Sequence, residues 1–410
     1  MTASPPPAHR LSRAARLLIG ARMVRAFGQG LLTVDFTLYL HALGWSSALI
    51  GGVITAVLVC SVTLTALVGP LSDRAGRRRF LVGYEIVTAL AAIVCMVSGD
   101  ARVLIAAAVV GGFGRGGAST SPFAPVESAW LSEVVPRARR GTVFSLRSAI
   151  AFFGLAAGAG LAGLPDLLQP WLPGALAYRP LFAVVLIMAL AALWLLWRAP
   201  EPQRPATPEP TPGETESSER RSENRLLSRL AGVNALNGLG IGLTGPLMAY
   251  WFSLAFHKGP SDIAPVMAVA FAAAGLSSLA AGWLTTRLGV MRSVVWLRMI
   301  GVGLLLALPL APTFAVAAGL YIARMACNLG TAGARLSLNI SLVGRARRGV
   351  AASLSSASMQ IPRAIGPTVA GLFFATGALA TPFFLAAGFQ TAYLVLYNRT
   401  FRRYDPSRPR

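Results

Sequence analysis

Few ionisable side chains lie inside the long apolar runs of this sequence, and their chemistry is the most informative. Asp35 is the one acid well inside the first run, within residues 32–38. A carboxyl group that is taken out of water favours its neutral form, so Asp35 could accept and release a proton. The alternative is that Asp35 lies close enough to the end of its run to stay hydrated and idle.

Arg115 is a second such residue, deep in the apolar run that contains Gly111 and Ser121. At about 1.5 Å per helical residue, Arg115 lies roughly 20 Å from one end of that run. A deep arginine costs at least about 2.5–3.5 kcal/mol in a bilayer. It should therefore face either a wet cavity, which implies a functional role, or an acidic partner, which implies a structural ion pair.

Further polar side chains recur at helical spacing inside other runs. They are Arg22, Arg25, Gln29 and Thr33, then Asn234 and Asn237, Arg324 and Asn328, and finally Gln360 and Arg363. The alternative for each amide is an ordinary hydrogen bond between helices. Together these residues predict a polar cavity in which arginines outnumber acids. If the arginines face water, their field favours an anionic or zwitterionic substrate.

The overall composition explains why these residues are so isolated. The 410 residues are 55% apolar and 13% charged, and the mean hydropathy is +0.61, whereas soluble proteins carry roughly 25% charged residues. Apolar runs of about 20 residues, long enough to cross a bilayer as a helix, predict about twelve spans. They are expected near residues 17–40, 47–70, 80–98, 102–130, 142–164, 180–198, 228–252, 263–285, 293–311, 313–335, 350–375 and 380–398.

No metal-binding, nucleophile or phosphate-binding pattern accompanies these spans. Cys60, Cys95 and Cys327 have no pair spacing, and the three histidines are scattered. Neither a disulfide nor a metal ion is predicted from them. The sequence therefore predicts a protein that is not an enzyme and needs no cofactor.

The net charge of +22 reflects membrane topology rather than a nucleic-acid partner, because the arginines cluster in short connections between apolar runs. Basic residues mark cytoplasmic connections. The intervening connections hold only Arg102, Arg179 and Lys258. Both termini are therefore predicted to lie in the cytoplasm, with the protein in a bacterial inner membrane and the first apolar run retained as a span.

A proline-rich and then polar stretch, residues 199–225, divides the chain into two halves and is predicted to be a flexible linker. The halves repeat one another, because Arg140-Gly141, Gly158 and Gly163 recur 208 positions later as Arg348-Gly349, Gly366 and Gly371. Parallel six-span repeats are a transporter architecture. The predicted organisation is a tail at 1–16, a six-helix bundle at 17–198, the linker, a six-helix bundle at 226–400 and a tail at 401–410.

The connection between spans two and three, residues 69–79, resembles the cytoplasmic loop signature of the major facilitator superfamily, Gly-x-Leu-x-Asp-Arg-x-Gly-Arg-Arg. The matching residues are Gly69, Leu71, Asp73, Arg74, Gly76, Arg77 and Arg78. The resemblance implies that Asp73 latches the two halves together. The second half contains a copy of this loop at residues 282–289, in which Thr286 replaces the acid. The latch is therefore predicted to depend mainly on the first copy. The alternative is a basic topology loop with an incidental aspartate.

Other segments resemble the same family in part. Arg115 and the small residues after it are similar to the family's span-four motif, although the usual Gln-Gly step is missing. The segment around Asp35 resembles the Asp-x-Thr pattern of some proton-coupled drug exporters. Residues 366–371 resemble the Gly-Pro-x-x-Gly-Gly bend of antiporters, but that bend normally belongs to span five. Glu85 and Glu127 are expected to pair with the arginines at 74–79, in a structural or gating role.

The resemblance implies an all-α polytopic fold of twelve transmembrane helices in two repeats, with spans one, four, seven and ten lining the cavity. The preferred function is proton-coupled export of drugs or metabolites by alternating access. One alternative is an uptake carrier for an organic anion or another small metabolite. Another is a scaffold or sensor that does not transport. The expected partners are a small-molecule substrate, protons and the lipid bilayer, and the protein is expected to work as a monomer.

Overall fold

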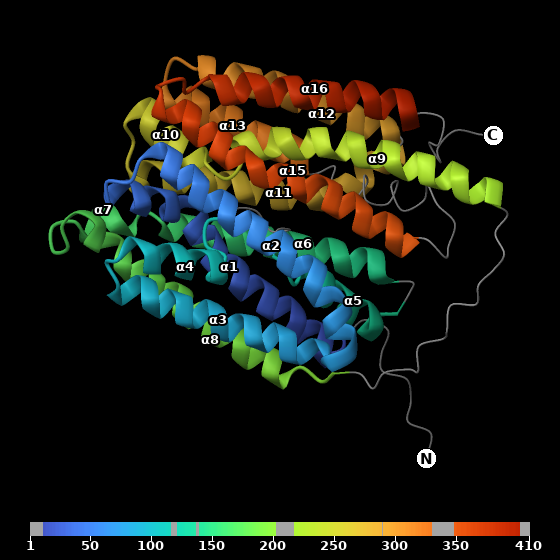
Figure 1. Ribbon diagram of the computed structural model, residues 1–410, viewed down its shortest axis with the longest axis horizontal. Helices are drawn as coiled ribbons and strands as arrows, with labels where there is room; N and C mark the ends of the chain where they lie inside the picture. The colour runs from blue at the N-terminus through green and yellow to red at the C-terminus, as the bar shows by residue number, and fades with distance from the viewer. Residues whose placement is uncertain are drawn as a thin grey trace.

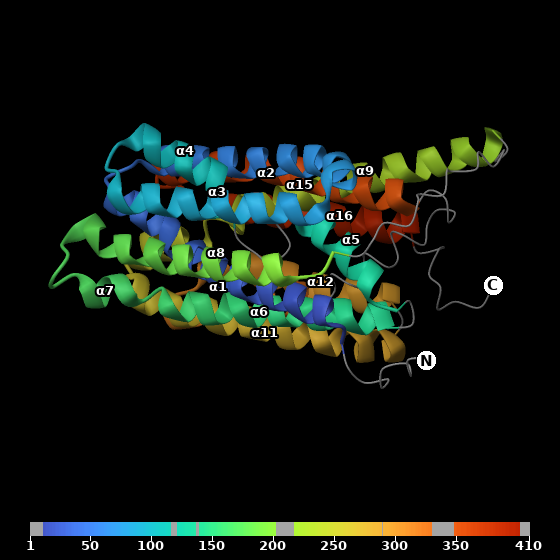
Figure 2. The ribbon, with the colours of Figure 1, turned by 90° about the horizontal axis from the view of Figure 1, so that it is seen from below.

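The computed structural model describes residues 11–115, 121–136, 139–201, 217–288, 290–329 and 348–401. These residues are mostly helical, and no strand occurs among them. The long helices lie alongside one another in one elongated bundle (Figure 1, Figure 2). We call the end of the bundle at which α1 begins and α16 ends the terminal end, and the opposite end the far end.

The first half of the chain forms the blue-to-green part of the bundle in Figure 1. Its helices are α1 Arg13–Ala42, α2 Ser47–Ala75, α3 Arg77–Val97, α4 Ala101–Gly111, α5 Ala124–Val134, α6 Arg140–Leu161, α7 Leu164–Leu168 and α8 Arg179–Arg198, with the 3-10 turn η2 at Gly174–Tyr178. The second half forms the yellow-to-red part. Its helices are α9 Ser217–Thr244, α10 Met248–Phe256, α11 Pro260–Leu288, α12 Val290–Ala307, α13 Phe314–Leu329, α15 Arg348–Ala375 and α16 Thr381–Phe401, with the 3-10 turn η3 at Leu308–Leu310.

Hydropathy identifies many of these helices as membrane spans. Six described helices are long and apolar enough to cross a membrane, and the bent pair Asn224–Thr244 and Met248–Phe256 makes a seventh if it counts as one span. Shorter apolar helices, among them α4 and α13, lie beside them. The predicted spans match the helices closely at most positions, such as 180–198 against α8.

The prediction of one continuous span at 102–130 is wrong, because α4 ends at Gly111 and α5 begins only at Ala124. Gly112 and Gly114 adopt positive φ angles of 70° and 74°, a conformation that glycine reaches without steric cost and that a helix does not allow. Arg115 therefore sits in an irregular segment between two short helices. Irregular backbone at membrane depth is tolerated where protein or a cavity surrounds it.

The predicted span at 228–252 also differs from the structure, because a 43° bend separates α9 from α10 at the break that contains Pro246. In addition, α9 already begins at Ser217, inside the stretch predicted as a flexible linker. Its first turns are rich in Glu and Arg, which are good helix formers. The other domain boundaries remain predictions, and residues 202–216 lie outside the described part.

The internal repeat appears in the structure as two equivalent helix crossings. In the first half a Cβ added to Gly30 of α1 would lie 2.1 Å from the carbonyl oxygen of Leu155 in α6. In the second half a Cβ added to Gly242 of α9 would lie 2.2 Å from the carbonyl oxygen of Arg363 in α15. Small residues let helix backbones approach closely in membranes. Gly366 packs against Gly242 in the same crossing, so part of the antiporter-like bend serves as a packing face.

Replacing Gly158 by alanine should destabilise the protein, because the added Cβ would lie 1.9 Å from the carbonyl oxygen of Phe27. The helices α1 and α6 would have to separate, and overpacking of this kind costs about 1–3 kcal/mol. The measurement is thermal unfolding of the purified variant in detergent. Gly52→Ala is the matched control, because nothing lies within 4 Å of its Cβ position. Equal unfolding temperatures for the two variants would contradict this account of the crossing.

The two halves are joined by hydrogen bonds in the part of the bundle toward the far end. The Thr368 hydroxyl bonds to that of Thr55 at 2.8 Å, between α15 and α2. The other pairs are the hydroxyls of Ser47 and Tyr250 at 2.6 Å, and the backbone N–H of Ser261, which donates to Asp166 Oδ2 at 2.8 Å. Close backbone contact accompanies these bonds, since a Cβ on Gly51 would lie 2.3 Å from the carbonyl oxygen of Pro367.

Candidate functional site

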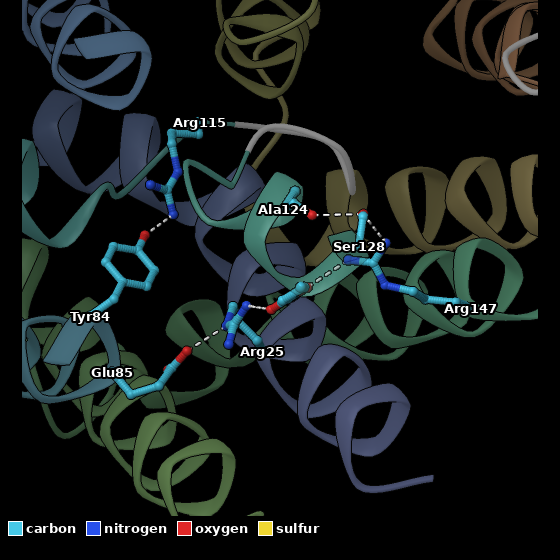
Figure 3. A network of polar contacts seen from close by, with 8 residues as sticks. Arg25, Tyr84, Glu85, Arg115, Ala124, Ser128 and Arg147 are labelled. Carbon is cyan, nitrogen blue, oxygen red and sulfur yellow. Dashed lines mark hydrogen bonds and ion pairs between the residues drawn. The ribbon is translucent and has the colours of Figure 1, made fainter. Parts of the chain in front are cut away.

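A buried ion network joins four helices of the first half (Figure 3). Arg25 of α1 donates from Nε to Glu85 Oε1 of α3 and from Nη1 to Glu127 Oε1 of α5. Arg147 of α6 donates to Glu127 Oε2 at 2.6 Å and to the Ser128 hydroxyl at 3.0 Å. The side chains of Arg25, Glu85 and Glu127 are 5% exposed or less. Two arginines and two glutamates thus compensate each other away from water.

This network corrects the expected partners of Glu85 and Glu127. Both carboxylates pair with arginines inside the bundle, Glu85 with Arg25 and Glu127 with Arg25 and Arg147. They pair in this way because Arg25 and Arg147 lie at the same level along the bundle as the two acids. Arg147 was not singled out from the sequence. Arg77 itself pairs with Glu133 of α5 at 2.7 Å, in a contact that is partly open to water.

The loop that resembles the family signature is described only in part. Gly76 ends α2 with a φ of 97°, which permits the sharp reversal into α3. The backbone N–H of Arg77 at the start of α3 donates to Glu201 Oε1 at 2.8 Å, so Glu201 is a carboxylate that meets this helix N-terminus. The side chains of Gly69, Asp73, Arg74 and Thr286 lie outside the described residues, and the latch role of Asp73 remains a prediction.

Arg115 is 6% exposed and lies at the contact between the two halves. Its Nη2 donates to the hydroxyl of Tyr84, and its Nη1 donates to the hydroxyl of Ser61 at 3.3 Å. Its backbone carbonyl accepts from Arg363 Nη2 of α15 at 3.4 Å. Among the described residues, these partners of the Arg115 side chain carry no negative charge. The described contacts thus pair the Arg115 side chain with hydroxyl groups, and its functional role remains a prediction.

Asp35 is 1% exposed, and neither of its carboxylate oxygens has a hydrogen-bond partner among the described residues. At about 100° per residue, Asp35 lies on the face of α1 that carries Gly28, two turns earlier. Gly28 packs against Val185 and Met188 of α8. Asp35 thus faces α8 within the first half, on a different face of α1 from Thr33.

The amides of α9 make hydrogen bonds between helices. Asn234 donates to the hydroxyl of Ser355 in α15 at 3.0 Å. Asn237 accepts from Arg298 Nη1 of α12 at 3.0 Å and donates to the sulfur of Met359 at 3.6 Å. These contacts favour the packing role that was the alternative to cavity lining. Arg298 is 3% exposed and was not singled out from the sequence.

The remaining polar candidates of the second half are spread over two helices. Arg324 of α13 is 7% exposed and Arg363 of α15 is 9% exposed. Asn328 lies against α12, because its Oδ1 is 2.7 Å from the Cβ position of Gly301. Gln360 is half-buried on α15. No aspartate or glutamate occurs in residues 263–401, the stretch that contains both of these arginines.

A pocket lies inside the first half, between α1, α3, α8 and the segment that follows α4. Arg25, Gln29, Glu85 and Arg115 line its polar part. The remaining lining residues are Gly28, Leu32, Tyr84, Thr88, Gly111, Gly112, Phe113, Gly114, Val185, Met188 and Ala189. The walls combine charged and apolar groups.

Comparison with known families gives one result for each half. The chain matches the family model of the Major Facilitator Superfamily over residues 18–229 and again over residues 230–410. The division between the two matches falls just after the predicted linker, in agreement with the internal repeat. Together the matches cover nearly the whole chain.

Among curated proteins the chain is similar to sugar carriers and to a drug-resistance protein. It is 34% identical over 107 residues to the Arabinose-proton symporter of Bacillus subtilis, covering 26% of this chain and 22% of that protein. It is 28% identical over 199 residues to the Multidrug resistance protein B homolog of Mycobacterium tuberculosis, covering 48% of this chain and 35% of that protein. The matched segments span well under half the length of these relatives.

Several solved structures share the fold over nearly their whole length. A nucleoside transporter superposes with a TM-score of 0.72 at 12% identity, covering 95% of this chain and 99% of that one. A D-xylose-proton symporter gives 0.72 at 15% identity, covering 93% and 97%. A bacterial homologue of the lysosomal transporter Spinster, inward-facing and occupied, gives 0.69 at 16% identity, covering 96% and 98%. At these identities the likeness shows the fold alone, and it confirms the predicted fold class.

Proposed function

Because the chain belongs to the Major Facilitator Superfamily, we propose that it moves a small anionic or zwitterionic solute through the centre of the bundle by alternating access. We infer the charge of the solute from one observation, the pair Arg115 and Arg363. Both are buried where the halves meet, and residues 263–401 contain no aspartate or glutamate. A site in which buried positive charges predominate attracts a ligand of negative charge. The sequence has no ATP-binding motif, so the driving force is an ion gradient or the solute gradient itself.

The contacts between the halves support a cycle with at least two states. Hydrogen bonds and close backbone contacts hold the halves together toward the far end, as at Thr55 and Thr368. In alternating access these contacts separate while the other end closes. We assign the present arrangement to the state in which the far end is shut.

Proton-coupled export of drugs or metabolites is the second candidate function, and Asp35 is the observation that favours it. A buried carboxyl without a hydrogen-bond partner among the described residues is suited to take up a proton. The relatives include both proton symporters and a multidrug resistance homologue. Import and export are therefore both compatible with Asp35 as the coupling residue.

The transport proposal is tested in proteoliposomes with a panel of organic anions, organic cations and neutral sugars, with and without a pH gradient. We expect uptake of anions or zwitterions, and we expect Arg363→Gln to reduce it. Arg198→Gln is the matched control, because Arg198 lies exposed at the terminal end of α8. Uptake of cations in preference to anions by the unaltered protein would overturn the proposed substrate charge.

The basic connections support a topology in which the terminal end faces the cytoplasm of a bacterial inner membrane. Reporter fusions at Gly213 and Arg410 should both give cytoplasmic signals. A fusion near Trp171, which lies between α7 and the 3-10 turn η2, serves as the control and should give a periplasmic signal. A periplasmic signal from either of the first two fusions would contradict this topology.

A further inference from the structure

The pocket inside the first half contains polar atoms that lack partners. Arg25 Nη2, Gln29 Oε1 and Arg115 Nε are buried, and none has a hydrogen-bond partner among the described residues. All three residues line the pocket, and both arginines are 6% exposed. Buried donors and acceptors without a partner are costly. A ligand that accepts from the guanidinium groups and donates to the amide oxygen would satisfy them.

The charge balance around the pocket defines the charge of that ligand. Arg25 and Arg147 are balanced by Glu85 and Glu127 in the ion network. Arg115 remains, with hydroxyl groups as its side-chain hydrogen-bond partners among the described residues. Arg22 of α1 is also buried beside this network, and its Nη1 has no partner among the described residues. The pocket and its surroundings thus carry an excess of positive charge. A carboxylate on the ligand would offset part of it.

Opposite the charged groups, one wall of the pocket is apolar. Leu32 of α1, Phe113 beyond α4, and Val185, Met188 and Ala189 of α8 form this wall. The glycines at the α4 break bring the backbone close to the polar part, since a Cβ on Gly112 would lie 2.1 Å from Arg115 Nη1. An apolar group on the ligand would displace water from this wall and contribute to binding.

Resting on the proposed function, we infer that the solute binds in this pocket and is a small amphiphilic carboxylate that carries a hydroxyl or amide donor. Its carboxylate contacts Arg115, its donor contacts Gln29 and its apolar group fills the wall against α8. Arg115 also touches Arg363 of the second half through its carbonyl, so an occupant of the pocket borders the contact that must rearrange during transport.

Binding to the purified full-length protein tests this inference directly, with calorimetry as the readout. The probes are 3-phenyllactate, which has all three features, lactate, which lacks the ring, 3-phenylpropanoate, which lacks the hydroxyl, and 2-phenylethanol, which lacks the charge. We expect 3-phenyllactate to bind about tenfold or more tightly than lactate, as burial of an aromatic ring implies. Lactate binding as tightly as 3-phenyllactate would overturn the inference.

Two variants and one control locate the binding. Ala189→Trp fills the apolar wall and should abolish the tighter binding of 3-phenyllactate relative to lactate. The control, Leu190→Trp on the exposed face of α8, should preserve it. Gln29→Leu should weaken 3-phenyllactate about tenfold and leave 3-phenylpropanoate unchanged, and this comparison remains valid if Ala189→Trp does not fold. Equal losses for both ligands in Gln29→Leu would contradict the assigned contact.

The outcome is separable from that of the transport proposal. If lactate and other short anions are transported but 3-phenyllactate binds no more tightly than lactate, the pocket inference fails and anion transport stands. If 3-phenyllactate binds with the expected variant effects but no anion crosses the liposome membrane, the pocket is a ligand site and the transport proposal fails.

Discussion

Replacing Glu127 by leucine should remove most of the folded protein, because Arg25 and Arg147 both lose a buried carboxylate partner. Breaking a buried ion pair by removing one partner costs about 3–5 kcal/mol. That is a large fraction of the roughly 5–15 kcal/mol by which proteins are stable. The measurement is the yield of monodisperse protein after extraction from the membrane, together with its unfolding temperature.

Glu133→Leu is the matched control, because Glu133 lies on the same helix and also pairs with an arginine, Arg77. Its side chain is 41% exposed, and exposed pairs contribute about 0–1 kcal/mol. Glu127→Gln should fall between the two, since it keeps an acceptor and removes the charge. Similar yields for Glu127→Leu and Glu133→Leu would contradict the structural role of the network.

Asp35→Asn should abolish accumulation driven by a pH gradient while solute exchange down its own gradient persists. Asparagine has nearly the same size as aspartate but cannot cycle a proton. The protein should remain folded or become more stable, because an unpartnered buried carboxyl is replaced by a neutral amide. The two assays are carried out on the same proteoliposomes with the best-transported solute of the panel.

Asp100→Asn is the control for this substitution. Asp100 caps α4 by accepting from the backbone N–H of Arg102 at 2.8 Å, and asparagine caps a helix equally well. It should leave accumulation unchanged. If Asp35→Asn vesicles still concentrate the solute in response to a pH gradient, Asp35 is not the proton carrier, and uniport or another coupling ion is favoured.

The helices were predictable because every span must cross the same thickness of bilayer, so that an apolar run of about 20 residues marks each one. The run at 180–198 and α8 agree within a residue. The break after α4 was not predictable from hydropathy, because residues 102–130 are mostly apolar and glycine is common in membrane helices. The left-handed conformations of Gly112 and Gly114 are set by packing, since Gly114 sits against Ile54 and Phe36.

The candidate site was predictable in part. Burial of Arg115 and Arg363 followed from their depth in apolar runs. The pairing of Arg25 with Glu85 and Glu127 joins residues 60 and 102 positions apart, and no local pattern encodes such contacts. One signal was available. Arg25, Glu85, Glu127 and Arg147 each lie within about three turns of the terminal end of their helices, and their charges cancel.

Reversible locking of the far end tests alternating access most directly. Thr55→Cys and Thr368→Cys are introduced together after Cys60, Cys95 and Cys327 are replaced by alanine. The two hydroxyls are 2.8 Å apart, so the new thiols should form a disulfide on oxidation. We expect oxidation to stop transport of the best panel solute, reduction to restore it, and the single-cysteine variants to be unaffected by either treatment. Transport at the same rate in the oxidised and reduced double variant would contradict a cycle that opens the far end.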